Sequence, residues 1–298
     1  MTQTSPLRYY SGIATDGHNW DAFEYRPGDV FVCVPPKSGT TWMQTICGLL
    51  IFGDPEAEIA IPDLSPWIEI RLNPEDFKMR LARLAQQSHQ RFLKSHSPLD
   101  GVPYFEDCTY LICHRHPLDV HFSMRNHVHN MKIDALDHFY TDDIAACFDA
   151  FLNNSIEDGG MDQPSLELIA HHLTTARAMA HLPNVHLFHY ATLSQDLPGQ
   201  MARVAKAIGV SHAPDLFDRL VAKASFKAMK SEALMRAPGA TRGLYKDPSA
   251  FFNSGQSGQW QGWLNAGQIA DYNAKIATLL SPEDRHYLET GTAPSFAL

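Results

Sequence analysis

Four short apolar segments, each followed by a stretch of helical periodicity, constrain the fold of this chain more than any other feature. The segments are apolar or β-branched and are bounded by turn residues or charges, as strands are. They cover residues 29–34, 91–94, 109–114 and 185–190. Helical patterns cover residues 41–52, 75–87, 118–126, 143–154, 165–180, 200–208, 215–224 and 266–280. This alternation predicts an α/β fold in which helices cover both faces of a central parallel sheet.

The chain is long enough to bury a large core, and it contains no linker rich in Pro, Gly or Ser that would divide it. We therefore predict a single domain over residues 1–298. Residues 236–263 form the longest irregular region. A loop of that length in a compact domain is usually functional or mobile, so we expect it to contribute to a binding site.

Charge and cysteine content narrow the class of protein. The formal net charge of −9 argues against a nucleic-acid partner, and any bound anion would need a local concentration of donors. The five cysteines lack the spacing of a zinc motif and are typical of buried, reduced thiols. The first ten residues lack a secretory pattern, and no apolar stretch is long enough to span a bilayer. We expect a soluble, cytoplasmic protein.

The joint after the first predicted strand reads PPKSGTTW, and its composition suits an anion. In an open parallel sheet, ligands bind beyond the carboxyl ends of the strands. A tight turn into a helix presents free N–H groups there, Lys37 adds a charge, and Gly39 lets the backbone approach closely. Thr40 and Thr41 can donate hydrogen bonds or cap the helix. The usual phosphate loop, GxxxxGK[ST], is not matched, because the lysine precedes the glycine. A plain capped turn is the alternative.

The second loop follows the predicted strand RFLK and contains Lys94, Ser95 and His96. Because side chains alternate along a strand, Lys94 and His96 should project to one side and Ser95 to the other. An imidazole beside a cation, close to an anion site, suits removal of a proton from a hydroxyl near neutral pH. The alternative is that His96 merely caps a turn.

The third loop begins at Arg115 and leads into a helix that contains Ser123 about two turns later. A guanidinium before a helix and a hydroxyl on it can grip a phosphate. A surface Arg115 paired with Asp119 is the alternative. Several histidines lie nearby, but no set of carboxylates completes a metal site, so we predict no metal.

Four segments in this order resemble the cytosolic-type sulfotransferases that use 3′-phosphoadenosine 5′-phosphosulfate (PAPS). PKSGTTW looks like their 5′-phosphosulfate loop, and KSHSP matches their Lys-[Thr/Ser]-His-x-Pro segment. RHPLDVHFS matches their Arg-x-Pro-x-Asp-x-x-x-Ser segment, and SFKAMK is similar to their adenine-contacting Ser-Phe-Lys-x-Met-Lys. The resemblance covers residues 29–263. SPWIE and SHSPLDG are typical of the bacterial branch, whose members are often labelled aryl or glycolipid sulfotransferases.

The resemblance implies a P-loop-like three-layer α/β/α fold and in-line transfer of a sulfuryl group from PAPS, without a metal, to a hydroxyl of a largely hydrophobic small molecule or lipid. It implies that His96 is the base, and that Lys37 and Lys94 stabilise developing charge. Trp42 and Phe226 would sandwich the adenine. The remaining cofactor-binding residues that it implies are Ser38, Gly39, Thr40, Thr41, Arg115, Ser123, Tyr190, Ser225, Asn253, Ser254 and Gly255.

One loop departs from the family pattern. Where the family usually has Arg-Lys-Gly followed by Gly-Asp-Trp, this chain has Asn253, Ser254 and Gly255, and then Gln259 before Trp260. Hydrogen bonds to an anion from neutral groups are weaker than charge-assisted ones. We therefore predict weaker PAPS binding than in a relative with Arg-Lys. The last forty residues also lack a convincing dimer motif, which leaves a homodimer as an open question.

Two other functions stay open at this point. A P-loop kinase or NTPase would share the strand–loop–helix joint, but it needs a lysine after the glycine and a magnesium-binding carboxylate, where YLICHR supplies an arginine. A non-catalytic nucleotide-binding protein would fit the loss of the two loop cations. For a sulfotransferase, we expect the acceptor pocket to involve Trp67 and residues 124–138 and 234–245.

Overall fold

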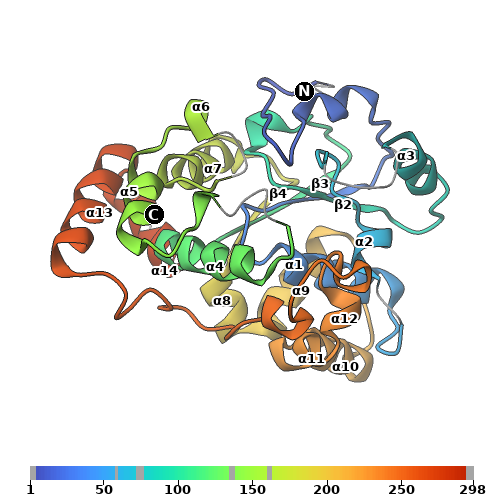
Figure 1. The fold of residues 1–298 in the computed structure, drawn as a ribbon. Coiled ribbons are helices and arrows are strands. Elements are labelled where there is room, and N and C mark those ends of the chain that lie inside the picture. Colours follow the sequence, from blue (N-terminus) through green and yellow to red (C-terminus); the bar gives the residue numbers. More distant parts are fainter. Residues whose placement is uncertain (1–4, 58–59, 72–76, 134–137, 160–162, 293–298) are drawn as a thin grey trace, which may run out of the picture.

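The computed structural model describes residues 5–57, 60–71, 77–133, 138–159 and 163–292 (Figure 1). Its four strands are β1 (Val30–Cys33), β2 (Phe92–Ser95), β3 (Thr109–His114) and β4 (Val185–His189). They form one parallel sheet in the order β2-β1-β3-β4. The predicted α/β fold with a central parallel sheet is confirmed.

Alternate residues of the strands enter two different cores, which explains why the strand segments are apolar throughout. On β1, Val30 and Val32 face one cluster, whereas Phe31 and Cys33 face the other. On β3, Leu111 and Cys113 share the first face, and Tyr110 and Ile112 the second. The sheet is therefore the middle of three layers.

Helices and the N-terminal segment cover these faces (Figure 1). The helices before β4 are α1 (Thr40–Phe52), α2 (Ile61–Leu64), α3 (Phe77–Ala85), α4 (Pro117–Asn130), α5 (Ile144–Asn153), α6 (Ile156–Gly159) and α7 (Leu166–Met179). Those after it are α8 (Tyr190–Gln195), α9 (Leu197–Ala207), α10 (Pro214–Ala224), α11 (Phe226–Ser231), α12 (Ala233–Arg236), α13 (Ala266–Leu279) and α14 (Pro282–Thr290). None of the described helices is long and apolar enough to cross a membrane.

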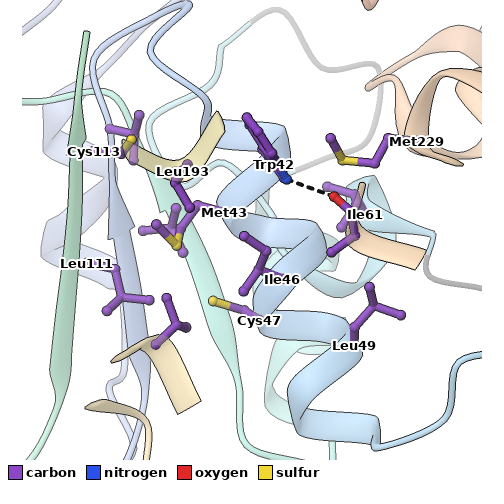
Figure 2. Close-up of a cluster of buried hydrophobic side chains, with 14 of the residues drawn as sticks. Trp42, Met43, Ile46, Cys47, Leu49, Ile61, Leu111, Cys113, Leu193 and Met229 are labelled. Atoms are coloured by element: carbon purple, nitrogen blue, oxygen red, sulfur yellow. Dashed lines mark hydrogen bonds between the residues drawn. The ribbon is translucent and has the colours of Figure 1, made fainter. Parts of the chain in front are cut away.

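Helix α1 is the element that fixes the anion site, because it is held in the core on all sides. Residues 40–50 are all buried, as expected for a helix that is apolar around its whole circumference. Figure 2 shows Met43 and Ile46 in the same apolar cluster as Leu111 of β3 and Met229 of α11. This packing holds the N-terminus of α1 at the carboxyl end of β1.

The predicted elements agree with the structure to within a few residues at their ends, with two kinds of difference. Tyr190 does not end a strand but begins α8, with the His189 side chain as its N-cap. The helices α2, α6, α11, α12 and α14 were not predicted, and the irregular region contains the 3₁₀ turns Ala240–Arg242 and Pro248–Phe251. Helices of one or two turns carry too little periodicity to stand out from loops, and α14, PEDRHYLET, has too few apolar residues to show one. The predicted helix start at 75–76 lies outside the described residues.

Candidate active site

A cavity of about 590 Å³ lies where the four loops converge, at the carboxyl ends of the strands. It gathers most of the residues singled out in the sequence. Those that line it are Lys37, Gly39, Thr40, Thr41, Trp42, Lys94, His96, Arg115, Ser123, Tyr190, Phe226, Asn253, Ser254 and Gly255. Ser38 and Ser225 are not among the described lining residues. Segments more than 200 positions apart thus share one site.

The loop after β1 holds a strained turn. The Ser38 N–H donates to the Pro35 carbonyl at 3.1 Å, and Lys37 between them has a φ of 63°. This is the left-handed position of a tight turn, which glycine normally takes, and no other described non-glycine residue has a positive φ. Such strain concentrates at functional sites. The Ser38 and Thr40 hydroxyls are buried and lack a partner in the described part of the chain, as donors kept for an anion would be.

His96 is oriented by the neighbouring strand end. Its Nδ1 lies 2.6 Å from the Val34 carbonyl oxygen, which can only accept. Nδ1 therefore carries the proton, and the lone pair of Nε2 is left for another proton. Burial, together with the charge of Lys94, holds the pKa of His96 well below its usual range. The imidazole is therefore neutral near pH 7, which is the state a general base requires.

Lys94 and His96 share one side of β2, as the pleat predicts, and both touch Trp67. The Lys94 ammonium lies 4.3 Å from the centre of the Trp67 ring, and the His96 ring packs edge-on against it at 4.9 Å. Backbone hydrogen bonds on both sides of Trp67 attach its segment to Lys94. Ser95 points the other way and donates to the buried Glu69 at 2.5 Å. Contacts on both faces of the strand thus hold the segment that contains Lys94 and His96.

Arg115 joins two loops and does not pair with Asp119. Its guanidinium donates to the Lys37 carbonyl at 3.1 Å and to the Gln256 carbonyl at 3.2 Å, and it lies 4.2 Å from the centre of the Tyr190 ring. Asp119, in the first turn of α4, accepts instead from two backbone N–H groups of the irregular region, at residues 258 and 259. The surface ion pair considered as an alternative is therefore wrong. These contacts hold residues 256–259 in place, although this loop lacks the Arg-Lys pair of the family pattern.

Trp42 and Phe226 are fixed by different contacts. The Trp42 indole N–H donates to the Ala224 carbonyl at 2.8 Å (Figure 2), and its ring meets Tyr190 edge-on. Phe226 packs directly under Gly255, where an added Cβ would lie 2.7 Å from its ring. Ser225, expected beside the base, instead caps α11 by accepting from the N–H of residue 228. Two aromatic rings therefore reach the cavity from α1 and α11.

The cations of the cavity repel one another. Burial and the charges of Arg115 and Lys94 lower the pKa of Lys37 to about 7, and burial lowers that of Lys94 to about 8 although Glu69 opposes the change. The Lys37 ammonium lies 4.6 Å from the centre of the Phe251 ring. A site of this kind favours an anion, which would relieve the repulsion.

The two segments expected around the acceptor meet in the structure. Met131 and Tyr245 form an isolated antiparallel bridge, and the Lys132 N–H donates to the Leu244 carbonyl. Trp67 lines the cavity as expected. The residues of the two segments that line it are Met124, His127, Met131, Lys132, Ile133, Pro238, Gly239, Arg242, Gly243, Leu244 and Tyr245. His138 does not line the cavity among the described residues, and residues 134–137 of the expected segment lie outside them.

Sequence reasoning missed several lining residues that no motif marks. They include Ala14 and Thr15 near the N-terminus, Ile61 and Pro62 of α2, and Phe251. Each reaches the cavity through tertiary packing, and Pro248–Phe251 gives only the weak pattern of a short 3₁₀ turn. Within the described ranges, no three His, Cys, Asp or Glu side chains come together as a metal site requires.

Comparisons with known proteins agree with this geometry. A family model described as "Sulfotransferase domain" matches residues 27–281. A glycolipid sulfotransferase of Mycobacterium tuberculosis is 32% identical over 92% of this chain and 91% of its own length. A 3-beta-hydroxysteroid sulfotransferase of Cavia porcellus is 24% identical over 85% of this chain and 84% of its own.

Solved structures show the same fold. A mouse sulfotransferase in complex with PAP has a TM-score of 0.69 and 20% identity, covering 89% of this chain and 90% of that one. PAP is the 3′,5′-bisphosphate that remains when PAPS loses its sulfuryl group. A retinol dehydratase in complex with retinol and PAP has a TM-score of 0.65 and 22% identity, covering 87% and 83%. The prediction of a PAPS-dependent transferase is confirmed, and the kinase alternative is set aside. The chain belongs to the sulfotransferase family.

Proposed function

We propose that this protein transfers the sulfuryl group of PAPS to a hydroxyl of a largely hydrophobic small molecule or lipid, with His96 as the general base. The observation that carries the proposal is the shared cavity, which brings the neutral imidazole of His96 together with Lys37, Lys94 and Arg115. A base and a local set of cations beside an apolar pocket suit an anionic donor and a neutral acceptor.

The residues present fit the donor. The unpartnered hydroxyls of Ser38 and Thr40 and the free N–H groups at the start of α1 would hold its 5′ end. Arg115 and Ser123 would hold the 3′-phosphate, and Trp42 and Phe226 would stack on the adenine. Tyr190 and the loop residues Asn253, Ser254 and Gly255 would complete the nucleotide wall. PAPS itself supplies the activated sulfuryl group.

His96 and the two lysines then each have one task in the transfer. The Nε2 atom of His96 takes the proton of the acceptor hydroxyl while that oxygen bonds to sulfur and the sulfur–phosphate oxygen bond breaks. Lys37 stabilises the charge that develops on the leaving phosphate oxygen. Lys94 and the N–H groups of residues 39–41 stabilise the equatorial sulfuryl oxygens, as preorganised donors do in phosphoryl transfer.

Variants of His96 test this proposal. With labelled PAPS and a panel of phenols, alcohols and glycolipids, His96→Ala should lose nearly all turnover, while its affinity for PAP stays within about threefold of the wild type. The exposed His181→Ala is the matched control and should keep normal turnover. Normal turnover in His96→Ala would refute the base, and PAP binding without transfer by the wild type would favour the non-catalytic alternative.

We also propose that residues 1–298 form one domain that works in the cytoplasm. The five cysteines are buried and unpaired, which a reducing compartment favours. Whether the chain forms a homodimer stays an open prediction.

A further inference from the structure

Helix α11 carries a lysine that reaches the nucleotide loop and has no task in the proposed mechanism. Phe226 and Lys230 lie four positions apart on this helix, so they share one of its sides. Phe226 packs under Gly255, and the Lys230 ammonium donates to the Asn253 carbonyl at 2.8 Å. Both side chains therefore support the loop of residues 253–255 from the same helix.

The loop that Lys230 supports has no cation of its own. Residues 253–255 are neutral, and all three line the cavity. Arg115, the proposed contact of the 3′-phosphate, donates to the Gln256 carbonyl at 3.2 Å, so the loop adjoins the proposed phosphate position. Lys230 is exposed and does not line the cavity among the described residues. It forms no ion pair in the described part of the chain, although its charge reaches Asp247. Its ammonium therefore acts on the backbone of the loop.

The hydrogen bond from Lys230 fixes which way one peptide group faces. In a trans peptide the C=O and N–H bonds point in opposite directions, so a carbonyl of Asn253 held by Lys230 turns the Ser254 N–H away from that lysine. No N–H group of residues 253–255 donates to another atom within the described ranges. Gly255 has a left-handed backbone, as in the concave arrangements of successive N–H groups that bind anions. If the peptide rotated, a carbonyl oxygen would take the place of the N–H group.

We propose that Lys230 is a positioning residue for the 3′-phosphate of the donor. It holds the peptide between Asn253 and Ser254 so that an N–H group, and not a carbonyl oxygen, faces the phosphate. A carbonyl oxygen in that place would repel the anion, and this loop has no side-chain cation to compensate. The inference rests on the proposed function, in which PAPS is the donor. It adds a residue outside the cavity that makes the site selective for a nucleotide with a 3′-phosphate.

Two nucleotides that differ by one phosphate test this role. PAP has the 3′-phosphate, and adenosine 5′-monophosphate (AMP) lacks it. In calorimetric titrations at low salt, Lys230→Met should weaken PAP binding by about fivefold and AMP binding by less than about twofold. Lys230→Arg keeps a charged donor for the carbonyl and should restore most of the affinity for PAP. A residue that merely stabilised the fold would affect the two nucleotides equally.

Lys227→Met is the matched control. Lys227 is exposed on the same helix and has no hydrogen bond or ion pair with a described residue, so its replacement removes the same charge without releasing the loop. The control should keep its affinity for PAP within about twofold of the wild type. Unchanged PAP binding in Lys230→Met overturns this inference and leaves the proposed function standing. An equal loss for PAP and AMP, or an equal loss in the two lysine variants, overturns it as well. A wild type that does not bind PAP overturns the proposed function.

Discussion

Replacing Gly255 by alanine tests whether Phe226 forms a wall of the nucleotide site. Gly255 has a φ of 70°, and a Cβ added there would lie 2.7 Å from Cγ and 2.8 Å from Cδ1 of the Phe226 ring. Real Cβ atoms do not approach ring carbons so closely, so either the ring or residues 253–255 must move. Both line the cavity, so the change acts directly on the proposed adenine pocket.

The substitution has two separable costs. A left-handed backbone costs an L-residue about 1–2 kcal/mol, which lowers the free energy of unfolding whether or not a ligand is bound. Displacing the Phe226 ring removes a stacking contact worth about 1–3 kcal/mol per base, which weakens PAP binding by about 5- to 150-fold. Calorimetric titration with PAP measures the second cost, and urea unfolding measures the first.

Gly209→Ala is the matched control. Gly209 has a φ of 74°, and a Cβ added there would have no described atom within 4 Å beyond its immediate chain neighbours. It should lose similar stability while its affinity for PAP changes by less than about twofold. In a Phe226→Ala background, Gly255→Ala should weaken PAP binding little further, because no ring remains to be displaced. If Gly255→Ala binds PAP as the wild type does, the Phe226 ring does not stack on the base.

Two further predictions concern the charges of the donor site. Asn253→Arg with Ser254→Lys places two cations on exposed positions that line the cavity. The double variant should tighten PAP binding by at least about tenfold at low salt and by less at high salt. No gain in affinity would show that this loop does not face the 3′-phosphate. Lys37 has a pKa of about 7 and is mostly uncharged at pH 8, whereas a bound anion favours its charged form. PAP binding at pH 8 should therefore take up close to one proton at Lys37 and up to about half a proton at Lys94, whose pKa is about 8, measured by calorimetry in buffers of different ionisation enthalpy. Lys37→Met should lower the uptake by close to one proton, and an unchanged uptake in that variant would contradict the assignment.

The sequence predicts the site well where local geometry decides the outcome. Lys94 and His96 share a side because the pleat of β2 requires it, and the loops after β1, β2 and β3 converge because parallel strands end at one edge. The motif spacings thus carry over into three dimensions. The roles of these residues remain predictions.

The sequence fails where a side chain has two local options and tertiary contacts choose between them. The spacing of Arg115 and Asp119 is compatible with an ion pair, but Asp119 lies in the first turn of α4 and meets N–H groups from residues 258–259. Ser225 could touch a base or cap a helix, and it caps α11. The bridge from Trp67 to Lys94 has no counterpart in the sequence, because its backbone hydrogen bonds join segments without any motif of their own.

The proposed donor site poses a physical problem, since three cations converge in a cavity of a protein that is acidic overall. Each cation rests on a different aromatic ring: Lys37 on Phe251, Lys94 on Trp67 and Arg115 on Tyr190. A cation over a desolvated ring gains about 2 kcal/mol, which offsets part of the burial cost and of the repulsion that together lower the pKa of Lys37. Because the rings carry no net charge, a cation can exchange its ring contact for a contact with a bound anion at little electrostatic cost. Such a site keeps its cations oriented before PAPS binds, which is the condition for electrostatic stabilisation of the transition state.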